Sequence, residues 1–145
     1  MIDMQSVKFV SVTPPEAIRD NSSWATAEID TKGFDYATIL VYLGATDIAM
    51  AALKLQESDT SGSGFADVSG ADFSVSPATL PSATDDNKLF AIFVDLTKRK
   101  RYLDLVMTAG DGATGTFAVA LAILSRAEEA PNSASERGLS QQLIV

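Results

Sequence analysis

The strongest constraint in this sequence is a series of short apolar runs, several of which are apolar at both odd and even positions. Tyr36–Leu43 (YATILVYL) and Leu89–Leu96 (LFAIFVDL) are rich in the β-branched and aromatic residues that favour strands. Side chains alternate between the two faces of a strand, so each run places apolar groups on both faces. A two-sheet sandwich covers only one face of each strand. The runs therefore predict a β-sandwich with apolar outer surface, which favours self-association or attachment to a larger surface.

Turn residues separate the runs at the short spacing typical of antiparallel sandwiches and barrels. The first run stops at Pro14–Pro15, because proline cannot donate to a ladder. We expect about eight strands: Gln5–Val12, Trp24–Ile29, Tyr36–Leu43, one from about Ala51 within Ile48–Glu57, Phe65–Val68, Leu89–Leu96, Tyr102–Thr108 and Thr116–Leu124. The predicted fold class is all-β, an antiparallel, jelly-roll-like β-sandwich with an extended C-terminal arm.

The 145 residues suit one domain, which we place at 1–126, followed by a C-terminal arm at 127–145. Ile48–Glu57 (IAMAALKLQE) is ambiguous, because its Ala, Met and Leu content favours a helix while its second half alternates like a strand. We favour the strand, with a short helical turn before it as the alternative.

The arm is polar, contains Pro131 and Gly138, and ends in three aliphatic residues. A solvated tail has little reason to end in exposed aliphatic side chains. We therefore expect the arm to bind a partner surface, with packing on its own domain as the alternative. Its expected partner-binding residues are Leu139, Leu143, Ile144 and Val145.

Composition excludes several function classes. Acids outnumber Lys and Arg by 19 to 11, giving a net charge of -8, which argues against nucleic acid or an anionic membrane as partner. The chain has no cysteine and no histidine, so a thiol nucleophile, the usual general base and the commonest metal ligand are missing. We expect no enzyme activity, no cofactor and no metal. Asp3 lies where a signal peptide carries positive charge, which favours a protein made in a cytoplasm.

Lys98, Arg99, Lys100 and Arg101 form the one basic cluster of the sequence. They lie in an expected turn within an acidic chain and have no aromatic platform beside them. A solvated turn, or a contact with an acidic protein partner, is favoured over nucleic acid. We include these four residues among the candidate partner-binding positions.

Five acidic residues are candidates for chemistry. Asp85, Asp86 and Asp111 carry oxygen ligands suited to a hard cation, but their spacing matches no calcium loop, and turn formation is favoured. Asp95 and Asp104 lie on expected neighbouring strands and could form the carboxylate pair of a glycoside hydrolase. Any acidic β-protein offers such pairs by coincidence, so this signal is weak.

Several short blocks resemble small proteins of tailed bacteriophages and prophages, encoded among virion structural genes near the major capsid protein. The blocks are Leu53–Asp59, Gly64–Phe73, Asp85–Ile92, Arg99–Leu103 and Ala127–Pro131. The likeness extends over roughly residues 30–145 and contains no catalytic signature.

The resemblance implies a virion component, a capsid cement or decoration protein that binds the major capsid protein as a dimer or trimer and stiffens the shell. Tail and head–tail proteins use similar small sandwiches and remain an alternative. A carbohydrate-binding module for host recognition is another, with Trp24, Tyr36 and Tyr42 as the candidate stacking residues.

Overall fold

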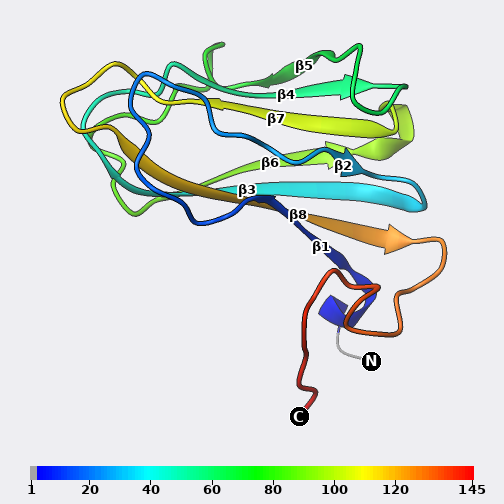
Figure 1. Cartoon of the computed structure of the whole chain (residues 1–145). Helices are drawn as coiled ribbons and strands as arrows, with labels where there is room; N and C mark the ends of the chain where they lie inside the picture. Colours follow the sequence, from blue (N-terminus) through cyan, green and yellow to red (C-terminus); the bar gives the residue numbers. More distant parts are fainter. Residues whose placement is uncertain (1–2) are drawn as a thin grey trace.

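The computed structural model describes residues 3–145 as two packed four-stranded sheets (Figure 1). Sheet A has the strand order β1-β8-β3-β6, and sheet B has the order β2-β7-β4-β5. The strands are β1 Lys8–Thr13, β2 Ile29–Asp30, β3 Phe34–Thr46, β4 Ala52–Ser58, β5 Ala66–Asp72, β6 Leu89–Asp95, β7 Tyr102–Thr108 and β8 Thr116–Ala127, with short 3-10 turns η1 Asp3–Ser6 and η2 Leu96–Lys98. The all-β sandwich predicted from the sequence is confirmed.

The topology is that of a jelly roll. The first strand pairs with the last (β1·β8), and β2·β7, β3·β6 and β4·β5 follow the same nesting, all antiparallel. The nested pairs form one long antiparallel hairpin, with β4 and β5 next to its turn. The hairpin is rolled up, so that β8 also pairs with β3 and β7 also pairs with β4. η1 and the C-terminal segment therefore lie together beside the β1 edge of sheet A (Figure 1).

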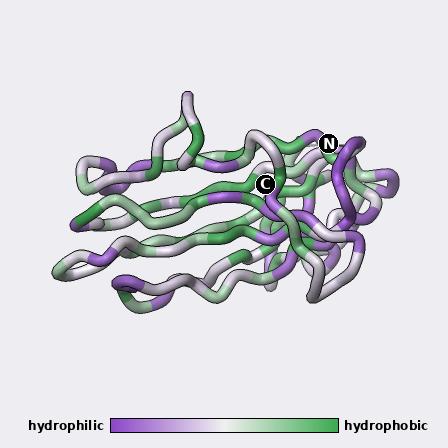
Figure 2. Tube along the Cα trace, turned by 90° about the horizontal axis from the view of Figure 1, so that it is seen from above, coloured by the Kyte–Doolittle hydropathy of each residue, from purple (hydrophilic) through white to green (hydrophobic). Residues whose placement is uncertain are grey.

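The core fills the space between the sheets. Ile39 and Leu43 of β3 and Leu53, Leu55 and Leu105 of sheet B are fully buried. Figure 2 shows hydrophobic positions spaced along the strands and hydrophilic positions gathered at several connecting loops. Only one set of alternating side chains in each strand enters this core, so the other set lies on an outer face.

The ambiguous segment is resolved as the strand β4. Leu53 and Leu55 point into the core, while Lys54 and Gln56 lie on the outer face and contact Asp67 of β5. Burial of the two leucines therefore outweighs the helix propensity of the preceding Ala and Met residues.

The structure corrects two expected strands. The first, expected from Gln5, begins at Lys8 and is preceded by η1. The second, Trp24–Ile29, is reduced to Ile29–Asp30. Its residues bond both sheets in turn, because the Trp24 N–H donates to Met107 O in sheet B and the Ala27 N–H donates to Val12 O in sheet A. Such a bridging segment cannot form one continuous ladder.

No helix in residues 3–145 is long and apolar enough to cross a membrane.

Candidate binding surface

The outer face of sheet A is an exposed apolar surface, which we call the apolar face. Its side chains come from the outward positions of β3, β6 and β8. Tyr42 is 47%, Leu89 66%, Phe93 80% and Phe117 44% exposed. The apolar face comprises Tyr36, Leu40, Tyr42, Leu89, Phe93, Phe117, Val119, Leu121 and Ile123.

Strand register makes these side chains neighbours. Tyr42 lies opposite Leu89 on β6 and Val119 on β8, and Leu40 lies opposite Leu121. Facing residues of an antiparallel pair have Cβ atoms about 4.5–5.5 Å apart, so their side chains touch across the strands. The surface is therefore continuous across three strands. Thr38 lies within this surface between Phe93 and Ile123, and the charged Asp95 and Arg126 border it beside Tyr36.

Sheet B differs, because its outer face is polar. Lys54 forms an ion pair with Asp67 at 2.7 Å, and Gln56 donates to the same carboxylate. These two contacts lower the pKa of Asp67 below its ordinary value, with the Lys54 hydrogen bond as the first cause. Thr26 donates to Asp104 at 2.8 Å. The two outer faces thus have opposite character, and the apolar face is the one suited to bury a partner.

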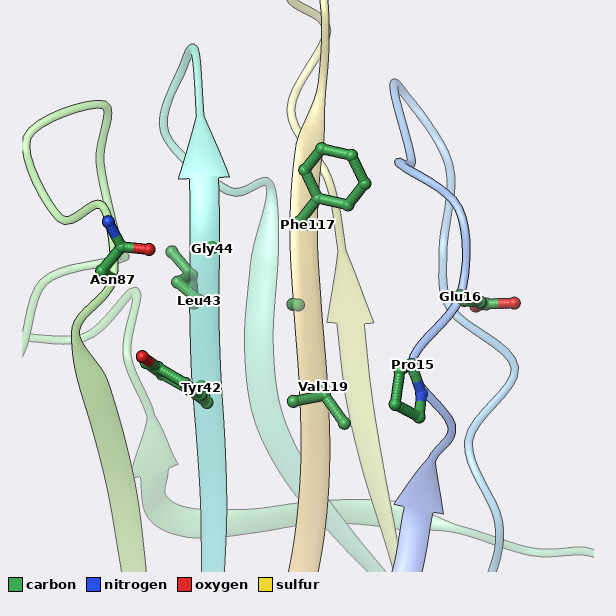
Figure 3. Close-up of a pocket in the computed structure, with 9 residues that line it drawn as sticks. Pro15, Glu16, Tyr42, Leu43, Gly44, Asn87, Phe117 and Val119 are labelled. Carbon is green, nitrogen blue, oxygen red and sulfur yellow. The ribbon is translucent and has the colours of Figure 1, made fainter.

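A shallow hollow of about 230 Å³ lies at one end of the apolar face (Figure 3). Tyr42, Phe117 and Val119 line it from β3 and β8, and Pro15 and Asn87 line it from adjoining loops. Phe117 lies beside Gly44, where a β-carbon would approach the Phe117 Cβ to 3.0 Å. Glycine at this position therefore lets the aromatic side chain approach the backbone of β3.

The basic cluster is largely neutralised within the chain. Arg101 forms a bidentate ion pair with Asp30, in which Nε and Nη2 each donate to one carboxylate oxygen at 2.8 Å. These hydrogen bonds lower the pKa of the Asp30 carboxyl. Arg99 pairs with Glu57 at 3.4 Å, and Lys100 pairs with Asp59 at 3.3 Å. These internal partners hold the turn between β6 and β7 and leave little uncompensated positive charge. Lys98 is exposed at the end of η2.

The four aliphatic residues of the arm that were predicted to bind a partner have different surroundings. Leu139 is half-buried, and its N–H donates to Ala134 O. Leu143, Ile144 and Val145 are exposed, with Val145 at 113%. The arm thus contacts its own domain through Glu128 and Arg137, most of its residues are exposed, and its last three project.

Arg137, which the sequence analysis missed, fixes the arm to sheet A. This side chain is buried, and its guanidinium donates to Gln5 O at 2.6 Å, Pro131 O at 2.7 Å, Asn132 O at 3.2 Å and Gln142 Oε1 at 2.8 Å. Its own carbonyl accepts from the N–H of Phe9, on the open side of β1.

Gly138, the residue after Arg137, has φ +73, and a β-carbon there would meet Phe9 O at 2.0 Å. The glycine was the one local sign of this close approach to β1, because only glycine adopts that conformation without strain and without a clash.

Of the three candidate cation ligands, Asp85 and Asp86 accept hydrogen bonds within the chain. Asp85 accepts from the N–H and hydroxyl of Ser82 and from Lys88, which together lower its pKa to about 2. Asp86 accepts from Thr46 N–H at 2.8 Å. Asp111 is exposed in the loop before β8. No group of three or more potential metal ligands occurs among residues 3–145.

The predicted carboxylate pair does not exist. Asp95 lies opposite Tyr36 on the outer face of sheet A, whereas Asp104 lies opposite Gln56 on the outer face of sheet B. The whole sandwich separates the two carboxyl groups, because β6 and β7 belong to different sheets although they are consecutive in the chain. The expectation that they lie on neighbouring strands is wrong.

The prediction that Trp24 is a sugar-stacking residue is wrong, because its side chain is buried and cannot contact a sugar at the surface.

No protein-family model matches this chain, and the searches of curated proteins and of solved structures found no match either.

Proposed function

We propose that this chain is a non-enzymatic structural protein that attaches to a larger protein surface through its apolar face. The observation that carries this proposal is the continuous apolar face across β3, β6 and β8, with Phe93 80% exposed and with Asp95 and Arg126 at its border beside Tyr36. Large exposed apolar patches are rare on monomeric soluble proteins, and where they occur they often mark interaction sites.

The size of the apolar face suits protein docking. Strands lie about 4.8 Å apart and rise about 3.3 Å per residue, so the face measures about 15–20 Å by about 25 Å, or roughly 400–500 Å² in plan. A standard protein interface buries about 800 Å² on each partner. The apolar face therefore supplies about half of such an interface, and neighbouring segments or a second subunit can supply the rest.

The larger surface we propose is the shell of the major capsid protein of a tailed bacteriophage, with this chain as a cement or decoration subunit on the capsid surface of the virion. The sequence blocks that resemble phage virion proteins support this location. The jelly-roll topology agrees with it, since capsid proteins are among the users of that fold, although a fold alone assigns no function. A tail or head–tail position is the alternative within the same class.

A cement subunit needs no catalytic group, cofactor or nucleic-acid contact. The net charge of -8 and the paired basic turn support a protein partner over the packaged DNA. A subunit that binds only the assembled shell stabilises it by linkage, by about 2.7 kcal/mol per site at a hundredfold excess over the dissociation constant.

The test compares substitutions on the two outer faces. Leu121→Asp places a charge in the centre of the apolar face, and Val106→Asp is the matched control on the central strand β7 of sheet B. We expect Leu121→Asp to weaken co-sedimentation with capsids lacking the protein by more than about tenfold, which is about 1.4 kcal/mol. Val106→Asp should bind like the wild type. Equal binding of both folded variants would contradict attachment through the apolar face.

The hollow beside Tyr42 and Phe117 favours a second candidate, a carbohydrate-binding module. Aromatic side chains next to the polar Asn87 and Glu16 could stack on a sugar ring and bond its hydroxyls. Tyr42→Ala should then abolish binding to immobilised cell-surface glycans. Glycan binding by the wild type, without capsid binding, would favour this function over the cement role.

A further inference from the structure

Strand β6 is an open edge of sheet A. The Leu43 N–H donates to Lys88 O at 3.1 Å, where these residues face each other just before β6 begins. Hydrogen-bonded pairs alternate along an antiparallel ladder, so the even-numbered residues of β6 bond β3. Leu89, Ala91 and Phe93 therefore turn their N–H and C=O groups away from β3, toward the open edge.

The opposite edge of sheet A is closed. The outward N–H of Phe9 on β1 donates to Arg137 O at 2.8 Å, and Val12 O accepts from Ala27 N–H at 2.8 Å. The arm and the segment before β2 thus occupy the backbone groups that another chain would need. Covering an edge in this way is a common protection against unwanted pairing.

The edges of sheet B are protected by other means. Strand β2 has two residues, too few to template a partner. Strand β5 carries Asp67 and Asp72, a shift in register against β4, and Gly70 with φ +82. Charges, bulges and short strands all hinder edge pairing. Within residues 3–145, β6 is the edge strand without such protection.

The composition of β6 favours pairing. From Leu89 to Val94 it has no charge, no proline and no glycine. Leu89 and Phe93 are 66% and 80% exposed, beside the small side chain of Ala91. A long, apolar, open edge strand is a ready template for another strand.

We propose that two copies of this chain pair antiparallel along β6 about a two-fold axis, which joins their two copies of sheet A into one continuous sheet. The occupant is a second copy, because a partner strand must itself offer an open apolar edge, and β6 is the edge on this chain that does. Pairing the same strand from both copies gives the closed, self-complementary interface typical of dimers. The uncharged stretch Leu89–Val94 also keeps acidic groups out of the paired segment, since Asp95 follows it at the end of the strand.

The side chains select the register. With Ala91 on the axis, Leu89 of each copy faces the partner's Phe93, so an aliphatic–aromatic pair flanks the small residue on both sides. The outward residues would then exchange about six backbone hydrogen bonds.

Pairing at β6 also places two apolar faces side by side. Together they measure about 800–1,000 Å² in plan, which reaches the size of a standard interface. The inference nevertheless does not rest on the capsid proposal, because it is tested on the purified protein alone.

The first test uses the absence of cysteine from the sequence. Residues that face each other across an antiparallel pair have Cα atoms about 4.5 or 5.5 Å apart, within the range a disulfide spans. Full-length Ala91→Cys should therefore oxidise to a covalent dimer. Ser11→Cys is the matched control, since Ser11 is exposed on the same face at the closed β1 edge. Dimer formation no faster than in this control would overturn the proposal.

The second test is sedimentation equilibrium. Ala91→Lys places two like charges opposite each other on the axis, and should raise the dimer dissociation constant more than about tenfold. Ser11→Lys adds the same charge to the same face and should leave dimerisation unchanged. A wild type that stays monomeric at high micromolar concentration, or that forms a closed trimer, would also overturn two-fold pairing at β6.

Discussion

At the scale of single residues, Arg137 shows how a buried cation can be held without a carboxylate. Three backbone carbonyls and one amide oxygen surround its guanidinium, and they come from both ends of the described chain. The planar fork of arginine reaches several acceptors at once, which a lysine cannot reproduce. This one side chain therefore ties the arm to η1, while the main-chain carbonyl of Arg137 binds β1.

We expect Arg137→Ala to lower the free energy of unfolding by about 2–3 kcal/mol, because the carbonyls of Gln5 and Pro131 lose their donor in a buried position. Residues 128–142 should also become sensitive to protease. Urea denaturation and limited proteolysis measure the two effects. Arg126→Ala is the control, since the Arg126 side chain is 68% exposed. Equal urea midpoints for both variants would show that Arg137 does not anchor the arm.

Asp85 predicts an acid-dependent contribution to stability. Hydrogen bonds from Ser82 and the contact with Lys88 lower its pKa from 3.8 to about 2. A pKa that is lower in the folded chain stabilises the fold above the ordinary value, and this contribution disappears as the pH falls through about 2. The stability difference between wild type and Asp85→Asn should therefore narrow from pH 5 to about pH 2. Urea unfolding of both proteins across this pH range measures the difference, and a difference that stays constant would contradict this role of Asp85.

Single residues were the hardest feature to predict from the sequence. Arg137 lies in a polar stretch, and its acceptor at Gln5 is distant in the chain, so no local pattern marked it. Trp24 and the pair Asp95 and Asp104 were misplaced for the same reason, because burial and sheet membership are set by the whole fold. The apolar surroundings of Tyr36 and Tyr42, by contrast, could be predicted, because both residues lie in one continuous apolar run of the sequence.

At the scale of elements, strands with their own strong pattern were predicted well. Tyr102–Thr108 matches β7 at both ends, and Leu89–Leu96 differs from β6 by one residue. Trp24–Ile29 failed because its hydrogen bonds go to both sheets, an arrangement that alternation cannot reveal. The sequence also could not tell which face of β3 enters the core, since both faces are apolar.

Two consecutive residues of β3, Ile39 and Leu40, lie on opposite faces of the strand and allow the two faces to be compared. Ile39 is fully buried, while Leu40 is half-exposed on the apolar face. Ile39→Ala should lower the free energy of unfolding by about 2–5 kcal/mol, because it leaves a cavity in the core. Leu40→Ala should cost less than about 1 kcal/mol. Thermal and urea unfolding of both variants measure the difference, and a larger loss for Leu40→Ala would mean that its face is buried in the protein as it exists in solution.

At the scale of the whole molecule, the rolled hairpin explains why the C-terminal arm lies beside the β1 edge of sheet A and not beside the β6 edge. The nesting of pairs leaves β1 and β6 as the two edges of that sheet. The arm follows β8 and closes the edge at β1, so one edge remains for a second copy. Eight strands could be predicted from the sequence, but this nesting could not, because it depends on contacts between strands far apart in the chain.

Removing the arm should change how the molecule assembles. A chain ending at Ala127 loses the Arg137 carbonyl that accepts from Phe9, so the first half of β1 becomes open in addition to β6, while Val12 stays bonded to Ala27. Two open edges on opposite sides of one sheet allow pairing to continue from copy to copy, and a contact that does not close produces filaments. Circular dichroism should show a retained β-fold, and light scattering should show growth with concentration that the full-length chain lacks. Adding Ala91→Lys should stop this growth at pairs joined through β1. A truncated chain that keeps the size of the full-length protein would show that the arm does not protect the edge.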